Sequence, residues 1–196
     1  QGVDKQQLQN MTDQAYKLIY TKFSWKKVAE RWFDFIQEVE ESQYKPKVAM
    51  VTTWNSKCGI AEYTKMEIEA SEHYVDYQVY PNYGVELLHR DEEFVQERLW
   101  HSVFQDDLDA LTESLLNSDN NIVHFQFNFV FFKLSYLGKA IELLSAQKKI
   151  IITFHKTEDS EIGGKMVSLK TIAKQLNLCA AIVIHQKKDQ ELLIKY

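Results

Sequence analysis

The chain has 196 residues, 45% of them hydrophobic and 13% aromatic, and its formal net charge at pH 7 is −5. This size and composition predict a globular chain with one domain of ordinary size and an appendage. The acidic balance and the lack of a Lys/Arg cluster count against nucleic acid as a main partner. No apolar stretch reaches the roughly 18 residues of a membrane helix, and a secretory signal is missing.

Residues 1–43 contain only helical patterns. One helix is expected over Met11–Tyr20, and a second from Trp25 to about Glu41 with Ser24 as its N-cap. Hydrophobic residues recur at helical spacing along the second helix, namely Val28, Ala29, Trp32, Phe33, Phe35, Ile36 and Val39. This apolar face is expected to pack on the following domain or on a domain outside the chain. Pro46 and the residues just before it end the helical segment.

From Lys47 onward, expected strands alternate with expected helices. The strands are short, apolar and rich in Val and Ile, as in a parallel sheet covered on both faces: Val48–Thr53, Tyr74–Tyr80, Ile122–Gln126, Ile150–Phe154 and Ala180–His185. The helices are Ala61–Ser71, Glu93–Asn117, Phe132–Ala146, Lys165–Leu176 and one from Lys187 to the end. This alternation predicts an α/β fold with a doubly wound, mostly parallel sheet over residues 44–196. Irregular segments are expected at Pro81–Gly84 and Glu158–Gly164.

The segment Lys47–Thr64 is the first strand-to-helix turn of this α/β region. Its only glycine, Gly59, stands where the helix begins. A glycine there lets the backbone come close to a bound group, and the helix N-terminus favours negative charge. With one glycine, the turn matches neither the dinucleotide-binding nor the P-loop fingerprint. The turn therefore predicts the ligand-binding edge of a sheet and nothing more specific.

Polar residues follow several of the expected strands, at the carboxyl edge where open α/β sheets bind ligands. They include Gln126, Asn128, His155, Glu158 and His185. For His155, a functional role and the simple start of a loop are equally favoured. A helix-start role is favoured for His185, and a buried structural role is favoured for His124, which lies inside a strand.

Cys58 and Cys179 lie far apart and lack the spacing of a zinc site or a redox pair. Both are expected to be reduced thiols in a cytoplasmic protein. No group of His, Cys, Asp and Glu has metal-ligand spacing, so the sequence predicts no metal site.

Four segments carry a further signal in their order and spacing: Val48–Trp54 with Cys58–Thr64, then Ile122–Phe127, Ile150–His155 and Ala180–His185. Taken together, they resemble the nucleotide-sugar glycosyltransferases of family 4, which have the GT-B fold. The resemblance covers about Pro46–Tyr196. Residues Phe23–Trp32 also resemble the helix that closes the C-terminal domain of such enzymes. The resemblance implies the Rossmann-like, acceptor-side N-terminal domain of one transferase module, preceded over residues 1–43 by the end of another. Both ends of the chain are therefore expected to lie inside a longer protein.

The resemblance implies a hexosyltransferase, of the retaining type, that moves a sugar from a UDP- or GDP-sugar to a glycan or lipid-linked acceptor in polysaccharide assembly. His155 matches the strand-end histidine that contacts the transferred sugar or the reacting centre, and is the implied catalytic residue. The implied substrate-binding residues are Cys58, Gly59, Ile60, Gln126, Asn128 and Glu158. Cys58 departs from the family pattern, which often has a second glycine at that position. The nucleotide sugar is a co-substrate, and no cofactor or metal is implied.

The Glu-x7-Glu motif of retaining members belongs to the C-terminal domain, so the chain alone is expected to have no transferase activity. The implied location is cytoplasmic, with peripheral association at the inner face of the membrane. The alternative from the residues is a non-catalytic, flavodoxin-like or receiver-like binding module. A receiver requires clustered acidic residues after its first strand, and this sequence has none there. For a flavodoxin, Asn55–Lys57 matches the phosphate loop only weakly. A degenerate transferase domain kept for scaffolding also remains open.

Overall fold

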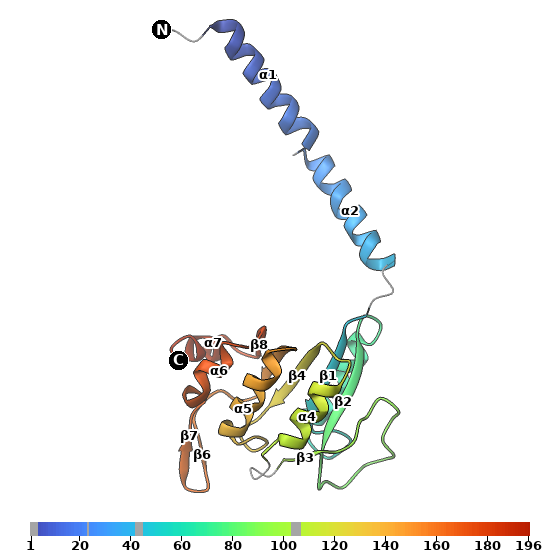
Figure 1. Ribbon diagram of the computed structural model, residues 1–196, viewed down its shortest axis with the longest axis vertical. Helices are drawn as coiled ribbons and strands as arrows, with labels where there is room; N and C mark the ends of the chain where they lie inside the picture. The colour runs from blue at the N-terminus through green and yellow to red at the C-terminus, as the bar shows by residue number, and fades with distance from the viewer. Residues whose placement is uncertain (1–3, 23, 42–44, 103–106) are drawn as a thin grey trace. The chain divides into compact units, whose positions relative to one another are not determined.

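The computed structural model describes residues 4–22, 24–41, 45–102 and 107–196 (Figure 1). The chain divides into two compact units, residues 1–44 and residues 45–196. The first unit holds helices α1 (Lys5–Lys22) and α2 (Trp25–Glu41). The second unit holds the sheet and the remaining helices.

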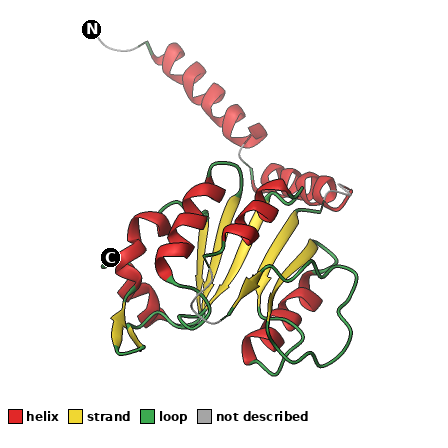
Figure 2. Cartoon of the chain, turned by 60° about the horizontal axis from the view of Figure 1, so that its bottom comes forward, coloured by secondary structure: helices red, strands yellow, loops and turns green. Residues whose placement is uncertain are grey.

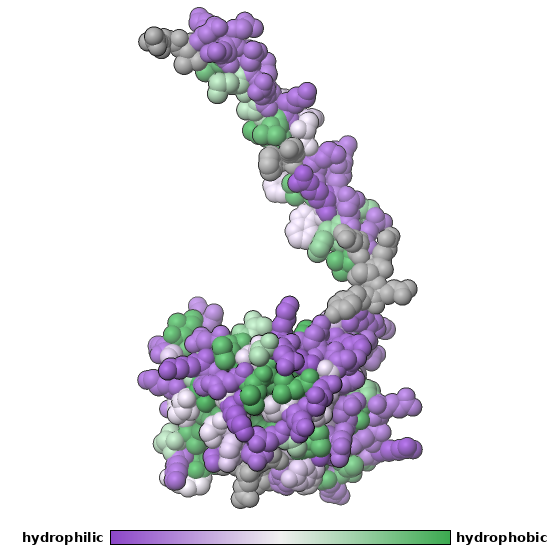
Figure 3. All heavy atoms as spheres, in the orientation of Figure 1, coloured by the Kyte–Doolittle hydropathy of each residue, from purple (hydrophilic) through white to green (hydrophobic). Residues whose placement is uncertain are grey.

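Helix α2 has the bounds that the sequence predicts, and α1 begins six residues before the expected Met11. The amide of Lys27 donates a hydrogen bond to Ser24 Oγ at 3.4 Å, as expected for an N-cap. Large hydrophobic side chains of α2 are exposed, among them Trp25 at 87% and Trp32 at 61%. Figure 3 shows hydrophobic and hydrophilic side chains side by side on the surface of both helices. The packing partner expected for this apolar face stays a prediction.

Residues 45–196 form an α/β fold around a parallel sheet. In the part of the chain that the structure describes, its six strands lie in the order β3-β2-β1-β4-β5-β8, and every pairing in the sheet is parallel. Their bounds are β1 Lys47–Thr52, β2 Asp76–Tyr83, β3 Trp100–His101, β4 Ile122–Phe127, β5 Lys149–Phe154 and β8 Ala181–Ile184. The main helices are α3 (Gly59–Ser71), α4 (Asp109–Asn117), α5 (Leu134–Ser145), α6 (Ala173–Leu176) and α7 (Lys187–Leu193).

Helices cover both faces of the sheet, as Figure 2 shows. On the α4 and α5 face, inward residues of β1, β4 and β5 pack with the two helices in the larger apolar cluster, among them Val51, Phe125, Ile152, Leu115 and Ile141. On the α3 face the apolar cluster is small and comprises Met50, Trp54, Ile68 and Val79. Successive strand residues point to opposite faces. His124 and Gln126 of β4 therefore lie on the α3 face. The doubly wound, Rossmann-like fold predicted from the sequence is confirmed.

The helix expected over Glu93–Asn117 is wrong in its first half. Glu93 and Phe94 form a turn, and Val95 then pairs with Val79 of β2: the amide of Val79 donates to Phe94 O at 3.0 Å, and the amide of Gln96 donates to Val79 O at 2.8 Å. β3 follows, and helix α4 begins only at Asp109. The outer edge of β2 needs hydrogen-bond partners, and this segment supplies them. Residues 103–106 lie outside the described residues.

The turn expected at Pro81–Gly84 is also wrong, because β2 continues through Pro81 to Tyr83. The backbone of Val79 bonds outward, away from β1, to the segment at residues 94–96. Pro81 lies two residues further on, so its missing N–H falls on the same outer side, where proline is tolerated in a sheet. The chain turns only at Gly84, which has a φ of 78°.

The expected loop Glu158–Gly164 and helix Lys165–Leu176 are replaced in large part by a hairpin. Strands β6 (Ser160–Ile162) and β7 (Lys165–Val167) pair antiparallel. Gly163 and Gly164 join them with φ values of 58° and 76°, as a two-residue hairpin turn requires. Only residues from Leu169 on are helical, first as a 3₁₀ turn, η1 (Leu169–Ile172), and then as α6.

Candidate active site at the carboxyl edge of the sheet

Parallel strands end at the same edge of a sheet, so the residues that follow β1, β4, β5 and β8 lie along one edge. At this edge, and on the α3 face next to it, a group of polar and aromatic side chains meets. We call it the His155 cluster; it comprises Tyr63, Glu67, His124, Gln126, Thr153, His155 and His185. It draws on helix α3 and on three neighbouring strands.

His155 is held at this edge from several sides. Its Nε2 atom lies 2.8 Å from Gln126 Oε1, and its backbone amide donates to Phe127 O at 3.1 Å. The Tyr63 ring and the imidazole pack edge to face, with ring centroids 4.9 Å apart. The His185 ring lies next to the imidazole, tilted by 38°, with 5.1 Å between the centroids. The structure thus brings together His155 and Gln126, two of the site residues implied by the resemblance.

Glu67 of α3 reaches the same group from the helix. Its Oε2 atom accepts a hydrogen bond from Gln126 Nε2 at 2.7 Å, and its Oε1 atom lies 3.7 Å from His124 Nδ1. The other ring nitrogen of His124, Nε2, is 2.7 Å from Thr153 Oγ1. His124 is 7% exposed, so it is the buried, hydrogen-bonded histidine that the sequence predicts.

Burial sets the protonation of these groups. It lowers the pKa of His155 to about 4, and a positive charge on His185 lowers it as well. Burial also lowers the pKa of His124 to about 4, with His155 as a second cause. The pKa of the Glu67 carboxyl is raised by burial, while the bond from Gln126 and the charge of His185 oppose the rise. Both His124 and His155 are therefore neutral at pH 7.

The start of α3 carries the three adjacent residues of the implied substrate site. Cys58 is the N-cap, and its Sγ accepts from Thr53 Oγ1 at 3.3 Å. Gly59 is exposed, and a Cβ added there would meet nothing within 4 Å. Ile60 is half-buried against the larger core. The amide of Cys58 donates to Ser56 O at 2.7 Å, and that of Glu62 donates to Cys58 O at 3.2 Å. In the described part of the chain, this leaves the amides of Gly59, Ile60 and Ala61 for an anion.

Helix α3 joins this turn to His155. Tyr63, which contacts the His155 ring, lies four residues after Gly59, or about 6 Å along the helix axis. A cavity of about 290 Å³ borders the same turn and is lined by Thr53, Ser56, Lys57, Cys58, Val85, Glu86, Ser102 and Phe131. The start of α3 therefore borders a cavity, and Tyr63 on its next turn contacts His155.

The turn before α3 is fixed by Asn55, which has a left-handed backbone with a φ of 52°. Asparagine tolerates this conformation better than most residues. Its side-chain amide donates to His89 O at 2.7 Å, and its Oδ1 accepts from the His89 amide at 3.1 Å. These paired bonds tie the turn to the segment that follows β2.

Asn128 and Glu158 lie at the same edge but outside the cluster. Asn128 Oδ1 accepts from the Val130 amide at 3.2 Å and serves the turn before α5. Glu158 is exposed and accepts from Lys188 Nζ at 3.1 Å. Among the residues that the structure describes, neither side chain makes a hydrogen bond or ion pair with the His155 cluster.

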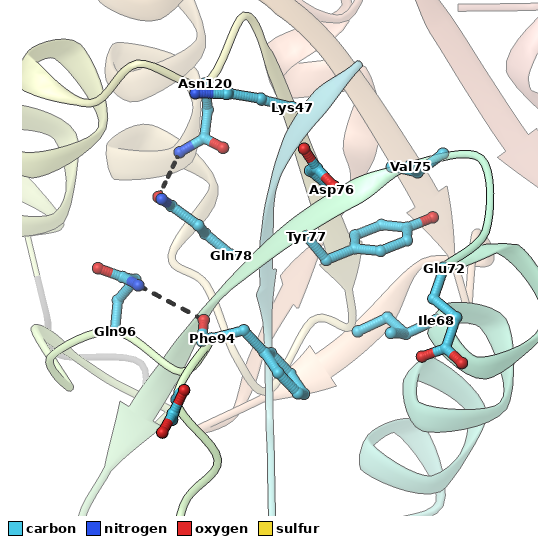
Figure 4. Close-up of a pocket in the computed structure, with 11 residues that line it drawn as sticks. Lys47, Ile68, Glu72, Val75, Asp76, Tyr77, Gln78, Phe94, Gln96 and Asn120 are labelled. Carbon is cyan, nitrogen blue, oxygen red and sulfur yellow. Dashed lines mark hydrogen bonds between the residues drawn. The ribbon is translucent and has the colours of Figure 1, made fainter. Parts of the chain in front are cut away.

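A larger pocket of about 480 Å³ opens at the opposite edge of the sheet (Figure 4). It lies at the amino ends of β1 and β2, where Lys47 and Asp76 begin these strands. Figure 4 shows the Asn120 amide directed toward Gln78, and its Nδ2 donates to Gln78 Oε1 at 2.7 Å. No residue of the His155 cluster lines this pocket. Ligands of open α/β sheets bind at the carboxyl edge, so we exclude this pocket from the candidate site.

Sequence reasoning missed Tyr63 and Glu67. Both lie on the expected helix, and their spacing of four residues puts them on one helical face. That spacing is the signal that could have identified them as site residues, had it been known that this face of the helix packs on β4 and β5. A surface position would have explained the same two residues equally well.

No protein-family model matches the chain, and no curated protein is significantly similar to it. None of the described helices is long and apolar enough to cross a membrane. Among the residues that the structure describes, no group of three or more His, Cys, Asp and Glu could hold a metal ion.

Proposed function

We propose that residues 45–196 are the acceptor-side domain of a retaining GT-B glycosyltransferase of family 4, which transfers a sugar from a UDP- or GDP-sugar to a glycan or lipid-linked acceptor. The observation that carries the proposal is the place of His155. It follows β5 at the carboxyl edge, half-buried, with its ring held between Gln126 and Tyr63. A side chain fixed in this way is pre-organised to contact a sugar at that edge.

The start of α3 provides a second observation that supports the proposal. Its first-turn amides and helix dipole favour an anion, and the diphosphate of a nucleotide sugar is such a group. Gly59 leaves open space beside these amides. A neutral His155 suits a sugar hydroxyl better than a phosphate, because it carries no charge to pair with the anion. We assign the diphosphate to the α3 turn and the sugar to His155.

The remaining chemistry requires a second domain. Stabilising the leaving diphosphate takes donors on both sides of a closed cleft that excludes water. We therefore expect the 196-residue chain alone to bind substrate fragments and to transfer no sugar. In the full-length protein we expect peripheral membrane association where the acceptor is a lipid.

A receiver-like module is the less favoured function. Receivers use carboxylates at the strand ends. Here Asn55 follows β1, Gln126 is the penultimate residue of β4, and His155 follows β5. The scaffolding alternative differs from the enzyme only in activity, so the test below separates the two.

The test measures nucleotide release by the full-length protein that carries this chain, supplied with UDP- and GDP-sugars and a lipid extract as acceptor. His155→Ala is expected to lower turnover by roughly 100-fold, the effect of losing one pre-organised polar contact to the reacting centre. The matched control is His73→Ala, since His73 is exposed in the turn after α3. Unchanged turnover in His155→Ala would remove His155 from the mechanism. Absence of nucleotide release and of nucleotide-sugar binding in the wild type would refute the proposed function.

A further inference from the structure

We propose that Glu67 is a positioning residue that fixes the tautomer of His155 through Gln126, with the ring proton on Nε2 and Nδ1 left as a hydrogen-bond acceptor. The side chains of Glu67 in α3, Gln126 in β4 and His155 after β5 form a chain of hydrogen bonds, which we call the relay. Gln126 Nε2 donates to Glu67 Oε2 at 2.7 Å, and Gln126 Oε1 faces His155 Nε2 at 2.8 Å.

The direction of each bond follows from the carboxylate at the start of the relay. An ionised carboxylate only accepts hydrogen bonds, so Gln126 must turn its NH₂ group toward Glu67. The carbonyl oxygen of Gln126 then faces His155 and requires a donor there, which is an Nε2–H group. The reversed amide would put two oxygens against each other at Glu67.

Burial makes this reversal costly. Gln126 has no exposed surface, so an amide turned the wrong way cannot replace its lost bonds with water. Its only other polar neighbour with a bond in the described part of the chain is the Met50 sulfur, 3.6 Å from Nε2, which is a weak acceptor. The relay therefore has one favoured direction.

The neutral state of His155 completes the assignment. A neutral imidazole carries one ring proton, so a proton on Nε2 leaves a lone pair on Nδ1. Within the described residues, Nδ1 of His155 makes no hydrogen bond. It is the ring nitrogen left for a ligand, and it takes a donor such as a hydroxyl group while it cannot donate to a phosphate oxygen. This last consequence rests on the proposed function, in which the ligand is a sugar.

The test reads the tautomer directly by long-range ¹H–¹⁵N correlation NMR of histidine in the 196-residue chain, at about pH 8, where an ordinary histidine is neutral. Wild type is expected to show a single Nε2–H tautomer for His155. Glu67→Gln makes both amide directions equivalent, and a mixture of tautomers is expected. Glu69→Gln is the matched control, with the same change on an exposed position of α3, and it leaves the single tautomer unchanged.

Exchanging the carboxylate and the amide between positions 67 and 126 is expected to restore the single tautomer. In the double variant Glu67→Gln/Gln126→Glu, the carboxylate stands next to His155 and again accepts from Nε2–H, so the single tautomer returns. An Nδ1–H tautomer in the wild type overturns the inference, as does a folded Glu67→Gln variant that keeps the Nε2–H tautomer alone. The readout needs no sugar transfer. A full-length protein that neither releases nucleotide nor binds a nucleotide sugar would therefore refute the proposed function and leave the tautomer assignment standing.

Discussion

Trp100 donates its indole N–H to the carbonyl oxygen of Tyr80 across 3.0 Å, and this bond ties the two-residue strand β3 to β2. The indole has no exposed surface. It stacks on the Phe132 ring, with centroids 4.8 Å apart and planes inclined by 27°. One side chain thus closes the outer edge of the sheet and anchors the chain just before α5.

We expect Trp100→Ala to lower the free energy of unfolding by about 3–5 kcal/mol, because it leaves a cavity the size of an indole in the core. Urea unfolding followed by circular dichroism checks this value. Trp25→Ala is the control for loss of an indole, since Trp25 is 87% exposed, and it should change stability by no more than about 0.5 kcal/mol. Equal effects of the two substitutions would contradict the role of Trp100.

Gly84 is required for two separable reasons. Its φ is 78°, and an added Cβ would lie 2.6 Å from His101 Nε2. We expect Gly84→Ala to be destabilising, and His101→Ala in the same chain to recover the part caused by the clash. The part that remains is the backbone strain, roughly 1–2 kcal/mol. A double-mutant cycle of unfolding free energies measures both parts, and additivity of the two substitutions would rule out the clash.

Gly59 differs from Gly84, because its backbone is not left-handed and a Cβ meets nothing within 4 Å. Gly59→Ala should therefore leave stability unchanged or raise it slightly. If the α3 turn approaches a diphosphate, the same methyl group should weaken the binding of UDP or GDP. Isothermal titration calorimetry of both nucleotides checks this. Equal affinity for wild type and Gly59→Ala would show that Gly59 is not the point of close approach.

The buried histidine His124 predicts an acid-sensitive fold. Its pKa is about 4 in the native state and about 6.5 in an unfolded chain. As the pH falls below 6.5 the unfolded state takes up a proton and the native state does not, so the free energy of unfolding falls. The loss reaches up to about 3 kcal/mol by pH 4.

Comparing wild type with His124→Gln in urea unfolding between about pH 7 and pH 4.5 isolates this contribution. The comparison is needed because His155 titrates with the same sign. Glu67 acts in the opposite direction: its raised pKa lets the native state bind a proton first as the pH falls. The variant should lose less stability on acidification than the wild type. Parallel pH profiles would mean that the pKa of His124 is the same in the native and the unfolded state, and would contradict the prediction.

Prediction from the sequence succeeded where no tertiary contact opposed the local hydrophobic pattern. β1, β4, β5 and β8 are short β-branched runs between turn residues, and α2 repeats its apolar residues at helical spacing. It failed at residues 93–102 and 158–168. At residues 93–102, edge pairing to Val79 and burial of Trp100 outweighed the helical pattern. At residues 158–168, the turn at Gly163 and Gly164 paired part of the expected loop with the start of the expected helix. These interactions depend on tertiary contacts or on the conformation of a turn, and the spacing of hydrophobic residues does not reveal them.

The sequence by itself determined the α/β class and the edge of the sheet where polar residues gather, because the hydrophobic period fixes strands and parallel strands end together. It also singled out Gln126 and His155 at that edge. Only the tertiary structure decided that Tyr63 and Glu67 join them. A helical pattern tells which residues share a face, whereas the packing of α3 against β4 and β5 selects the neighbours of that face. The direction of the hydrogen bonds from Glu67 through Gln126 to His155 depends on that packing.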